Sequence, residues 1–509
     1  MYLLGLDIGT TNWKANLYDL KGRLVKSVST PTPLRKDGRG NNYYDPGELW
    51  STFCRLTKLI AGSVRAPEQI VSISFGSMAE AGLIVDASGK PLSHIIPWFD
   101  KRTLLQAEKL QKKISKETIF NITGINLQYI FSVCKILWLK ENDNKAFKKA
   151  KKWLCVPDYL VYKFSGVMAT DYSIASRTAL FDLREKKWSK RMLKASGISE
   201  AFLPVALPSG TAVGNITAAA SKECGLSVKT RVVLGGHDHL CGGLGAGIYK
   251  EGVFCDSMGT SESAVVPLKN LRNLKKYYKT GFSFGCYVFG GLYYAMSGIY
   301  LSGGLIDWLA GVFYGGSAHR KKNELYELLI KDANSSVPGS GGLMVYPHWL
   351  GIGAPHVLRH ARGVMAGFTP ESKKEDIINA AFEGLAFEYR LTLETLEKAV
   401  NFKFKVIKTI GGGSRNRTLL QRKADIMGRD LLVPHVFESV CFGAALLGGL
   451  GAGVIKDPQE LIKNFKQDII RHDKKLFLYY NKYYKEHYLK LYANILPYWE
   501  KQVKNVRRT

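Results

Sequence analysis

The sequence predicts an α/β protein built from two large domains, and three observations support this fold class. The chain has 509 residues, which is too long for a single hydrophobic core. Strand-like apolar runs alternate with segments of helical periodicity along both halves, which is typical of α/β proteins. An acid followed by a Gly-Thr turn occurs twice, once at the start of each half. We therefore expect two related halves.

The first half runs from Leu3 to about Ala246. Leu3 to Tyr18 has the pattern of a strand, a tight turn at Gly9-Thr10-Thr11 and a second strand. The same apolar and helical patterns predict further strands at Ile70–Phe75, Gly82–Asp86 and Val232–Gly235, and helices at Asp45–Leu59, Ser132–Lys140 and Pro157–Phe164.

The second half begins near Gly252, and its regular pattern ends around Gly453. Its opening repeats that of the first half, with Asp256 before Gly259-Thr260-Ser261. The patterns predict strands at Tyr287–Tyr294 and Lys405–Gly411, and helices at Lys374–Val400, Thr418–Met427 and, rich in small residues that allow close packing, Ser439–Gly453. We expect the tail from Leu476 to form a final amphipathic helix. No low-complexity linker separates the halves, so we expect domains 1–247 and 248–509 to meet tightly around a cleft.

Composition narrows the class of protein. The formal charge of +29 comes mostly from lysines spread over the whole length, which favours a general compositional bias over a nucleic-acid surface. No apolar run is long enough for a membrane span, and the chain starts with a strand and not with a secretion signal. The eight cysteines form no C-x-x-C pair, a pattern that fits reduced thiols in the cytoplasm. We expect a cytoplasmic protein without membrane or nucleic-acid partners.

The two Gly-Thr turns have the chemistry of phosphate-binding turns. Glycine lets the backbone fold tightly against a phosphate, and hydroxyls and exposed amides supply donors. The preceding acids, Asp7 and Asp256, cannot bind a bare phosphate, so a magnesium ion or its water shell is their expected partner. A single turn of this kind is common in ordinary hairpins. Its occurrence in both halves favours a nucleotide bound between them.

A glycine-rich cluster, Gly235 to Gly247, follows the apolar strand that ends near Leu234. This order places Asp238 at the start of a helix, where a carboxylate can act as a general base in phosphoryl transfer or simply cap the helix. His237 and His239 have metal-like spacing, but no further ligands accompany them, so packing or hydrogen bonding is their expected role.

Gly411 to Asn416 lies between a predicted strand and a predicted helix. Glycines at such a turn let a flat ring or a phosphate approach the backbone, and the helix N-terminus favours an anion; a plain tight turn is the alternative. The chain lacks the P-loop motif, and its glycine spacings give no dinucleotide fingerprint.

Several ordered motifs resemble those of the FGGY carbohydrate kinases. The chain is identified as a member of this family on motifs that span roughly Leu3 to Gly453: Asp7-Ile8-Gly9-Thr10-Thr11-Asn12, Thr123-Gly124, Phe131-Ser132, Lys135 to Leu139, Asp158-Tyr159-Leu160, Thr170 to Arg177, Gly236-His237-Asp238, Asp256 to Ser261, Gly363 to Phe368, Ala380 to Gly384 and Gly411 to Asn416.

The resemblance implies two actin/hexokinase-like (ribonuclease H-like) domains, each a mixed five-stranded sheet between helices, that close over ATP, Mg²⁺ and a small sugar or polyol. Asp238 is implied to deprotonate the sugar hydroxyl, and Asp7 to hold the magnesium through water. Lys14 is implied to lie near the transferred group. The other residues implied to bind the nucleotide are Thr10, Thr11, Asn12, Gly259, Thr260, Gly303, Gly412, Gly413, Ser414 and Asn416. Asp256 then loses the metal role and is expected to shape its own turn.

The implied substrate site contains Met78, Ala79, Glu80, Asp100, Arg102, Asp238 and His239. Glycerol kinases carry Arg-Glu at the position of Ala79-Glu80, so a donor fork for glycerol is absent here. The Trp98-Phe99-Asp100-Lys101-Arg102 run is similar to a sugar-kinase pattern in which Asp100 and Arg102 bind hydroxyls or close the site. These features predict a ketose substrate, with xylulose as the leading candidate and fuculose, ribulose or glycerol as alternatives. A non-catalytic actin-fold regulator is a further alternative, and similar kinases are frequently homodimers.

Overall fold

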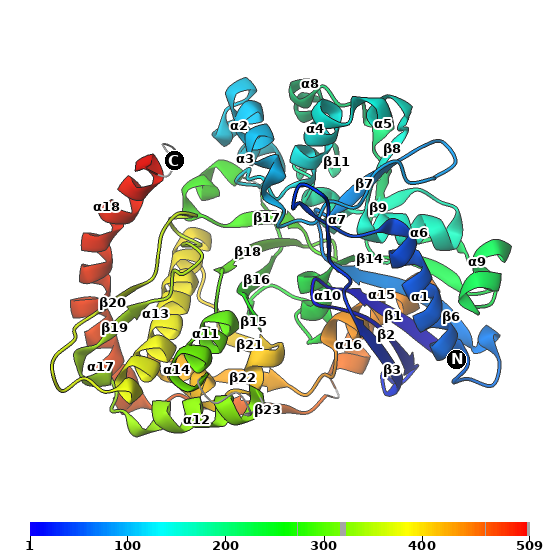
Figure 1. Ribbon diagram of the computed structural model, residues 1–509. Helices are drawn as coiled ribbons and strands as arrows, with labels where there is room; N and C mark the ends of the chain where they lie inside the picture. Colours follow the sequence, from blue (N-terminus) through cyan, green and yellow to red (C-terminus); the bar gives the residue numbers. More distant parts are fainter. Residues whose placement is uncertain (272, 316–321, 464, 506–509) are drawn as a thin grey trace.

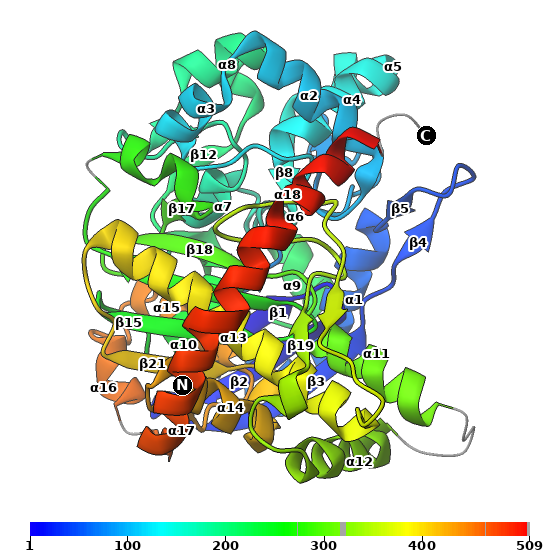
Figure 2. The ribbon, with the colours of Figure 1, turned by 90° about the vertical axis from the view of Figure 1, so that its left-hand side faces the viewer.

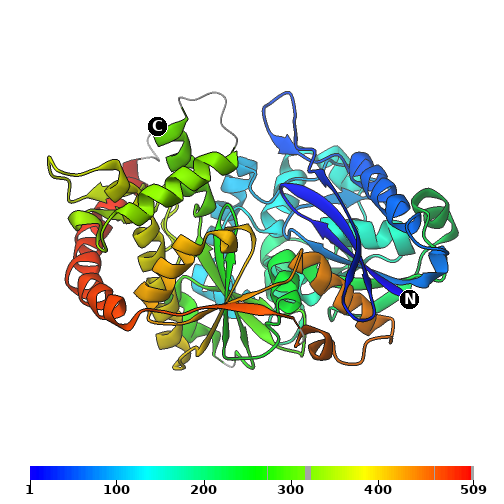
Figure 3. The same ribbon diagram turned by 90° about the horizontal axis from the view of Figure 1, so that it is seen from below.

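The protein consists of two lobes, each organised around a mixed β-sheet (Figure 1). The computed structural model describes residues 1–509 except 272, 316–321, 464 and 506–509. The two lobes lie side by side when the molecule is seen from below (Figure 3).

The N-terminal sheet has the strand order β13-β14-β6-β1-β2-β3. Its members are β1 (Tyr2–Ile8), β2 (Asn12–Asp19), β3 (Leu24–Pro31), β6 (Ile70–Ser77), β13 (Ala212–Asn215) and β14 (Arg231–His237). β1 pairs antiparallel with β2 and parallel with β6, and β6 pairs parallel with β14. Successive side chains of β1 point to opposite faces of the sheet, and both faces carry apolar residues. Leu4 and Leu6 belong to the hydrophobic core on one face, and Leu3 belongs to the core on the other.

The C-terminal sheet has the order β17-β18-β16-β15-β21-β22-β23. Its members are β15 (Val253–Met258), β16 (Glu262–Leu268), β17 (Ser283–Cys286), β18 (Tyr293–Ile299), β21 (Val406–Ile410), β22 (Leu431–Pro434) and β23 (Gln467–Ile470). The series β18-β16-β15-β21-β22 repeats the pairing directions of β3-β2-β1-β6-β14. The two halves are therefore related, as the repeated turn predicts.

Two expectations about strands are wrong. The sheets have six and seven strands and not five, because β13, β17 and β23 add antiparallel strands at the edges of the five-strand cores. The predicted strand Tyr287–Tyr294 spans a hairpin, which turns through Gly290 and Gly291 at φ of 68° and 66°. Aromatic and apolar residues on both arms gave this segment the composition of one strand.

Two short helices meet at the junction of the lobes. α10 (Asp238–Gly245) follows β14, and α15 (Ser439–Gly451) follows β22. A Cβ atom added to Gly443 would lie 1.9 Å from the carbonyl oxygen of Cys241, so the two backbones touch. α15 also packs on β1, β6 and β14, and Figure 3 shows this orange part of the chain beside the blue N-terminal strands. The small-residue helix thus joins the second half to the first.

Helices cover the outer faces of the sheets. α1 (Pro46–Ala61) and α6 (Val156–Ser165) pack on the N-terminal sheet, and α13 (Lys374–Val400) and α14 (Arg417–Met427) pack together in the C-terminal lobe. The remaining helices are α2 (Leu104–Lys113), α3 (Lys116–Thr123), α4 (Ser132–Asn142), α5 (Asn144–Lys149), α7 (Tyr172–Ser176), α8 (Lys190–Ser196), α9 (Ala218–Cys224), α11 (Gly303–Tyr314), α12 (Lys322–Ser335) and α16 (Pro458–Ile462). Short two-stranded pairs are β4–β5 (Arg35–Lys36, Asn42–Tyr43), β7–β8 (Gly82–Val85, Lys152–Cys155), β9–β12 (Ala169–Asp171, Val205–Leu207), β10–β11 (Phe181–Asp182, Lys187–Trp188) and β19–β20 (Met344–Tyr346, Val364–Ala366).

The tail crosses the outer face of the C-terminal lobe (Figure 2). It consists of α17 (Lys474–Tyr483), one π-helical turn (Tyr484–Tyr488) and α18 (Leu489–Asn505). Its buried face is aromatic, and Trp499 is fully buried.

Among the described helices none has the length and apolarity that crossing a membrane requires. All eight cysteines are buried and unpaired.

Candidate functional site

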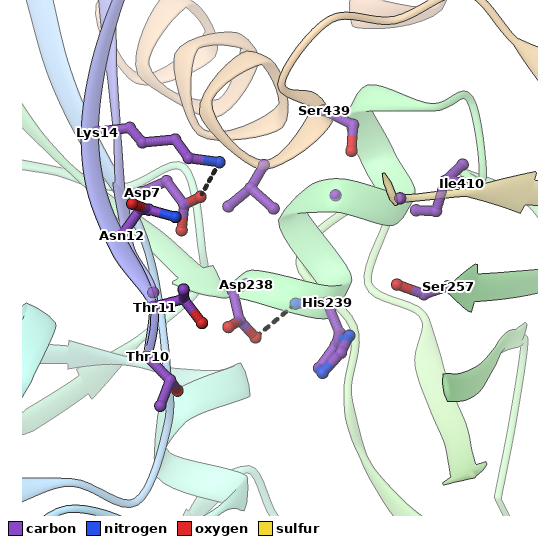
Figure 4. A pocket seen from close by; sticks show the side chains of 14 residues that line it. Asp7, Thr10, Thr11, Asn12, Lys14, Asp238, His239, Ser257, Ile410 and Ser439 are labelled. Atoms are coloured by element: carbon purple, nitrogen blue, oxygen red, sulfur yellow. Dashed lines mark hydrogen bonds and ion pairs between the residues drawn. The ribbon is translucent and has the colours of Figure 1, made fainter. Parts of the chain in front are cut away.

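A cavity of about 250 Å³ opens between the lobes (Figure 4). Its walls come from the β1–β2 turn, the start of α10, the ends of β15 and β21 and the start of α15. The lining residues are Asp7, Gly9, Thr10, Thr11, Asn12, Lys14, Asp238, His239, Gly242, Ser257, Ile410, Gly411, Ser439 and Val440. The structure thus brings together Asp7, Lys14, Asp238, His239 and the residues of the first Gly-Thr turn.

The β1–β2 turn presents its hydroxyls to the cavity. The Gly9 amide donates to the Asn12 carbonyl at 3.1 Å, which closes the turn. Thr10 and Thr11 are exposed, and the Trp98 indole donates to the Thr10 hydroxyl at 3.2 Å. Exposed hydroxyls at a tight turn can donate to a phosphate.

Asp7 and Lys14 lie side by side on this wall. The Lys14 ammonium is 3.6 Å from Asp7 Oδ2 and 2.5 Å from Glu438 Oε2. Burial raises the pKa of Asp7 to about 7; Lys14 opposes this shift, and the nearby carboxylates of Asp238 and Glu438 add to it. Asp7 thus lies near two further carboxylates, while Lys14 is the nearby cation that opposes them, and a divalent cation would supply additional positive charge there.

Asp238 is the first residue of α10, directly after β14. The N-cap position belongs to His237, which makes no capping hydrogen bond through its side chain. Asp238 Oδ1 accepts from the His239 amide at 2.7 Å, and the carboxylate points into the cavity with about a quarter of the side chain exposed (Figure 4). Burial raises the pKa of Asp238 to about 7, with Glu80 adding and Arg177 opposing.

The two histidines beside Asp238 are neutral. Burial lowers the pKa of His239 to about 4 and that of His237 well below its ordinary value. Their ring centroids are 5.4 Å apart. No set of three or more His, Cys, Asp or Glu side chains arranged to hold a metal occurs among the described residues.

Asp256, the counterpart of Asp7 in the C-terminal sheet, faces away from the cavity. Its Oδ2 lies 2.7 Å from the ammonium of Lys423 on α14, and Lys423 also pairs with Glu262; all three side chains are fully buried. The Ser302 hydroxyl donates to Glu262 Oε2 at 2.7 Å. The acid therefore supports its turn through a buried ion pair.

The second Gly-Thr turn contacts the start of α11. The Gly303 amide donates to the Gly259 carbonyl at 3.1 Å, and the Gly304 amide donates to the Thr260 carbonyl at 3.1 Å. A Cβ at Gly303 would lie 2.5 Å from the Gly259 oxygen, so this approach requires glycine. Gly259, Thr260 and Gly303 form one surface outside the cavity lining.

The loop after β21 lies beside the second turn. Gly411 lines the cavity, and a Cβ there would meet the Met258 carbonyl at 2.4 Å. Gly412 and Gly413 continue a short 3₁₀ turn, and the Ser414 hydroxyl donates to the Gly411 carbonyl at 2.7 Å. Asn416 caps α14 through Oδ1, while its buried Nδ2 has no hydrogen-bond partner among the described residues.

Met78, Ala79 and Glu80 follow β6 and are buried. Glu80 adopts φ of 63°, in the left-handed region, and its Oε1 accepts from Arg177 Nε at 2.7 Å. None of the three lines the cavity, but the charge of Glu80 acts on Asp238.

Asp100 and Arg102 contact each other. Arg102 Nε donates to Asp100 Oδ1 at 2.8 Å, and Arg102 Nη2 donates to the Asn42 carbonyl at 2.5 Å. Asp100 Oδ2 accepts from the Asn42 amide at 2.8 Å. Both side chains are buried and bound to each other and to the β4–β5 hairpin, away from the cavity lining.

Sequence reasoning missed Glu438, Arg177 and Lys423 as partners of site residues, and Ser257, Ser439 and Val440 as cavity lining. Each lies far along the chain from the residue it contacts: Glu438 is 424 positions from Lys14, and Arg177 is 97 from Glu80. A local signal existed for Arg177 and Ser257, because each lies in one of the family motifs.

The FGGY family of carbohydrate kinases matches the chain in two parts, with its N-terminal domain at residues 2–245 and its C-terminal domain at residues 257–452. A glycerol kinase of Petrotoga mobilis is 29% identical over 484 residues, which cover 92% of this chain and 93% of the relative. A xylulose kinase of Bacillus subtilis is 28% identical over 466 residues, which cover 91% of each protein.

The crystal structure of gluconate kinase from Lactobacillus acidophilus has the same fold, with a TM-score of 0.88 at 21% identity over 98% of this chain and 99% of that one. Because the two matched domains together span most of its length, this chain belongs to the FGGY family of carbohydrate kinases, ATP-dependent enzymes that transfer a phosphoryl group to an alcohol acceptor.

Proposed function

We propose that the protein uses ATP and Mg²⁺ to phosphorylate a hydroxyl of a small ketose, with xylulose as the leading candidate and Asp238 as the general base. The observation that carries the proposal is the position of Asp238 at the start of α10, facing the Gly-Thr turn and Asp7 across one cavity. Its pKa near 7 suits a base that works at neutral pH.

The residues around Asp7 fit a magnesium ion bound through water. Asp7 would hold the ion through its water shell, and Glu438 and Asp238 would add negative charge nearby. When bound, the ion would neutralise charge on the phosphates of ATP.

The chain's own groups account for the other parts of phosphoryl transfer. Asp238 would take the proton of the acceptor hydroxyl as its oxygen bonds to the γ-phosphorus, while the bond from that phosphorus to the bridging oxygen breaks and ADP leaves. Thr10, Thr11 and Asn12 would contact phosphates from one wall, and Lys14 would lie near the transferred group. Gly259, Thr260, Gly303 and the 412–416 loop would hold the nucleotide from the other wall.

Glycerol is the second candidate acceptor. Glycerol kinases carry an arginine next to the glutamate, where this chain has Ala79. The absence of that arginine favours a ketose as the acceptor. However, Arg177 supplies Glu80 with a guanidinium from elsewhere in the chain, and a glycerol kinase is among the relatives. The ketose assignment therefore needs a direct comparison of acceptors.

The test is ADP release with a panel of ketoses, polyols and sugar acids, run on the native protein and on Asp238→Asn. A general base contributes about 10² to 10⁴ in rate, so we expect Asp238→Asn to lose about that factor in kcat while ATP binding is retained. Asp86→Asn, which changes an exposed turn, serves as the matched control and should leave kcat unchanged. Unchanged turnover in Asp238→Asn would place the base elsewhere, and glycerol as the best substrate would remove the ketose preference.

A further inference from the structure

Lys14 connects the two halves of the chain at the cavity. On the antiparallel strands β1 and β2 it lies directly opposite Asp7, a position in which opposite charges attract each other across the strands. Its ammonium nevertheless lies 2.5 Å from Glu438 Oε2 and 3.6 Å from Asp7 Oδ2. The shorter contact is therefore with Glu438, which is 424 positions later in the chain.

The backbone of Glu438 is unusual for a glutamate. Glu438 occupies the N-cap position of α15 with φ of 54° and ψ of 60°, in the left-handed region that is unfavourable for residues other than glycine. N-cap residues are ordinarily Ser, Thr, Asp or Asn, whose side chains accept a hydrogen bond from the first turn, and Glu438 makes no such bond. Neither the helix start nor the backbone explains a glutamate here, whereas the ion pair with Lys14 does.

This ion pair lies at the wall of the cavity. Lys14 lines the cavity together with Asp7 (Figure 4), and so do Ser439 and Val440, the two residues that follow Glu438. The Lys14 and Glu438 side chains are 23% and 26% exposed. The Tyr18 hydroxyl on β2 donates to the Glu438 carbonyl at 3.4 Å, and α15 packs on β1 and β2. The carboxylate that binds Lys14 is therefore itself held in place.

The geometry indicates what would follow from losing this carboxylate. An ammonium has three donors and no acceptor, and Glu438 engages it at the shorter distance. Without Glu438, Asp7 is the other acid that pairs with this ammonium among the described residues. Lys14 would then move onto its cross-strand neighbour, and both groups would lose the positions that they have at the cavity.

We propose that Glu438 is a positioning residue whose carboxylate holds the Lys14 ammonium at the cavity wall, apart from Asp7, where it contacts the transferred phosphoryl group. This inference rests on the proposed kinase function. It gives the second half of the chain a task in the reaction besides nucleotide binding, because Glu438 sets the position of a cation that the first half carries.

The test is a double-mutant cycle of Glu438→Gln and Lys14→Met. The measured quantity is kcat for ADP release with whichever of D-xylulose and glycerol is the better acceptor. Glu438→Gln removes the charge at nearly constant shape, and kcat should fall roughly 10- to 100-fold because a displaced group at the reacting atoms has an effect of that order. The acceptor KM should stay within about twofold of the native value.

Lys14→Met should lower kcat at least as much, and the double variant should have the same kcat as Lys14→Met, because Glu438 then has no ammonium to position. Losses of kcat that multiply in the double variant overturn the proposal, since Glu438 would then act independently of Lys14. The matched control is Glu141→Gln on α4, which removes a glutamate that is 40% exposed and lies 2.8 Å from Lys109; its kcat should stay at the native value.

Thermal unfolding separates positioning from stability. Glycine suits the left-handed backbone and is accepted at an N-cap, so Glu438→Gly should have a Tm equal to or above the native value while its kcat falls as in Glu438→Gln. A lower Tm together with native kcat would show that Glu438 only supports the start of α15. Failure of the native protein to release ADP with any ketose, polyol or sugar acid overturns the kinase proposal itself, and the positioning role falls with it.

Discussion

At the scale of single residues, the two related acids of the halves have opposite surroundings. Asp7 lies at the cavity with Lys14 shared between it and Glu438, whereas Asp256 is buried against Lys423. The strands that carry them are equivalent, so the difference comes from the side chains that other segments bring. Only the first acid retains a charge that a ligand can reach.

The raised pKa of Asp238 predicts a pH dependence of catalysis. A base with a pKa of about 7 is active when deprotonated, so kcat/KM for the acceptor at saturating ATP and Mg²⁺ should fall as the pH drops below 7, approaching tenfold per pH unit. Burial lowers the pKa of His239 to about 4 and that of His237 well below its ordinary value, so neither histidine adds a limb in this range. A profile measured from pH 5.5 to 8.5 would show this limb, and a flat profile would contradict it.

At the scale of elements, the contact between α10 and α15 positions the base. The carbonyl of Cys241 on α10 touches Gly443 of α15, and the Ser439 carbonyl lies close to Gly245. α15 comes from the second half, so the helix that carries Asp238 rests on a helix almost two hundred residues later in the chain. Residues larger than glycine at these positions would push the helices apart.

Gly443→Ala is therefore expected to lower the free energy of unfolding by about 1 to 3 kcal/mol through overpacking and to lower kcat by displacing Asp238. The control is Gly311→Ala in α11, where an added Cβ meets nothing within 4 Å; alanine should raise the free energy of unfolding there by about 0.5 to 1 kcal/mol. Urea denaturation and steady-state kinetics measure both effects. Equal stability of the two variants would contradict close backbone packing.

The predicted elements agree with the structure where a pattern is local. The helix Lys374–Val400 has the predicted bounds, and the turns at Gly9 and Gly259 join the predicted strand pairs. The predicted strand at Tyr287–Tyr294 is wrong because residues of strand composition stand on both sides of Gly290-Gly291, and these two glycines form a turn with left-handed backbone angles. The edge strands β13, β17 and β23 are short and depend on a neighbouring strand, so local periodicity does not distinguish their place in a sheet.

At the scale of the whole molecule, the tail stabilises the C-terminal lobe from outside. α18 lies along the outer edge of that lobe, on the side opposite to α10 and β1 (Figure 1). Trp499 donates its indole N–H to the Arg362 carbonyl at 2.9 Å and packs edge-on against Tyr346, His348 and Tyr492. The tail thus contributes packing and no lining residue to the cavity.

Trp499→Ala should lower the free energy of unfolding by about 3 to 5 kcal/mol, because it leaves a cavity in an aromatic core. Turnover well below the melting temperature should stay near the native value. Tyr498→Ala, next to it and 57% exposed, should change stability by less than about 0.5 kcal/mol. A large loss of kcat in Trp499→Ala under conditions where it is folded would show that the tail acts on the site.

The sequence by itself determined the two related α/β halves, the two Gly-Thr turns, the place of Asp238 at the start of a helix and the resemblance to the carbohydrate kinases. Each of these follows from the periodicity or motif of consecutive residues. Only the tertiary structure decided which acid faces the cavity, that Glu438 shares Lys14, and that Arg177 pairs with Glu80. These are contacts between residues about a hundred to several hundred positions apart. They depend on how two sheets and the α10–α15 pair pack, which no local pattern encodes.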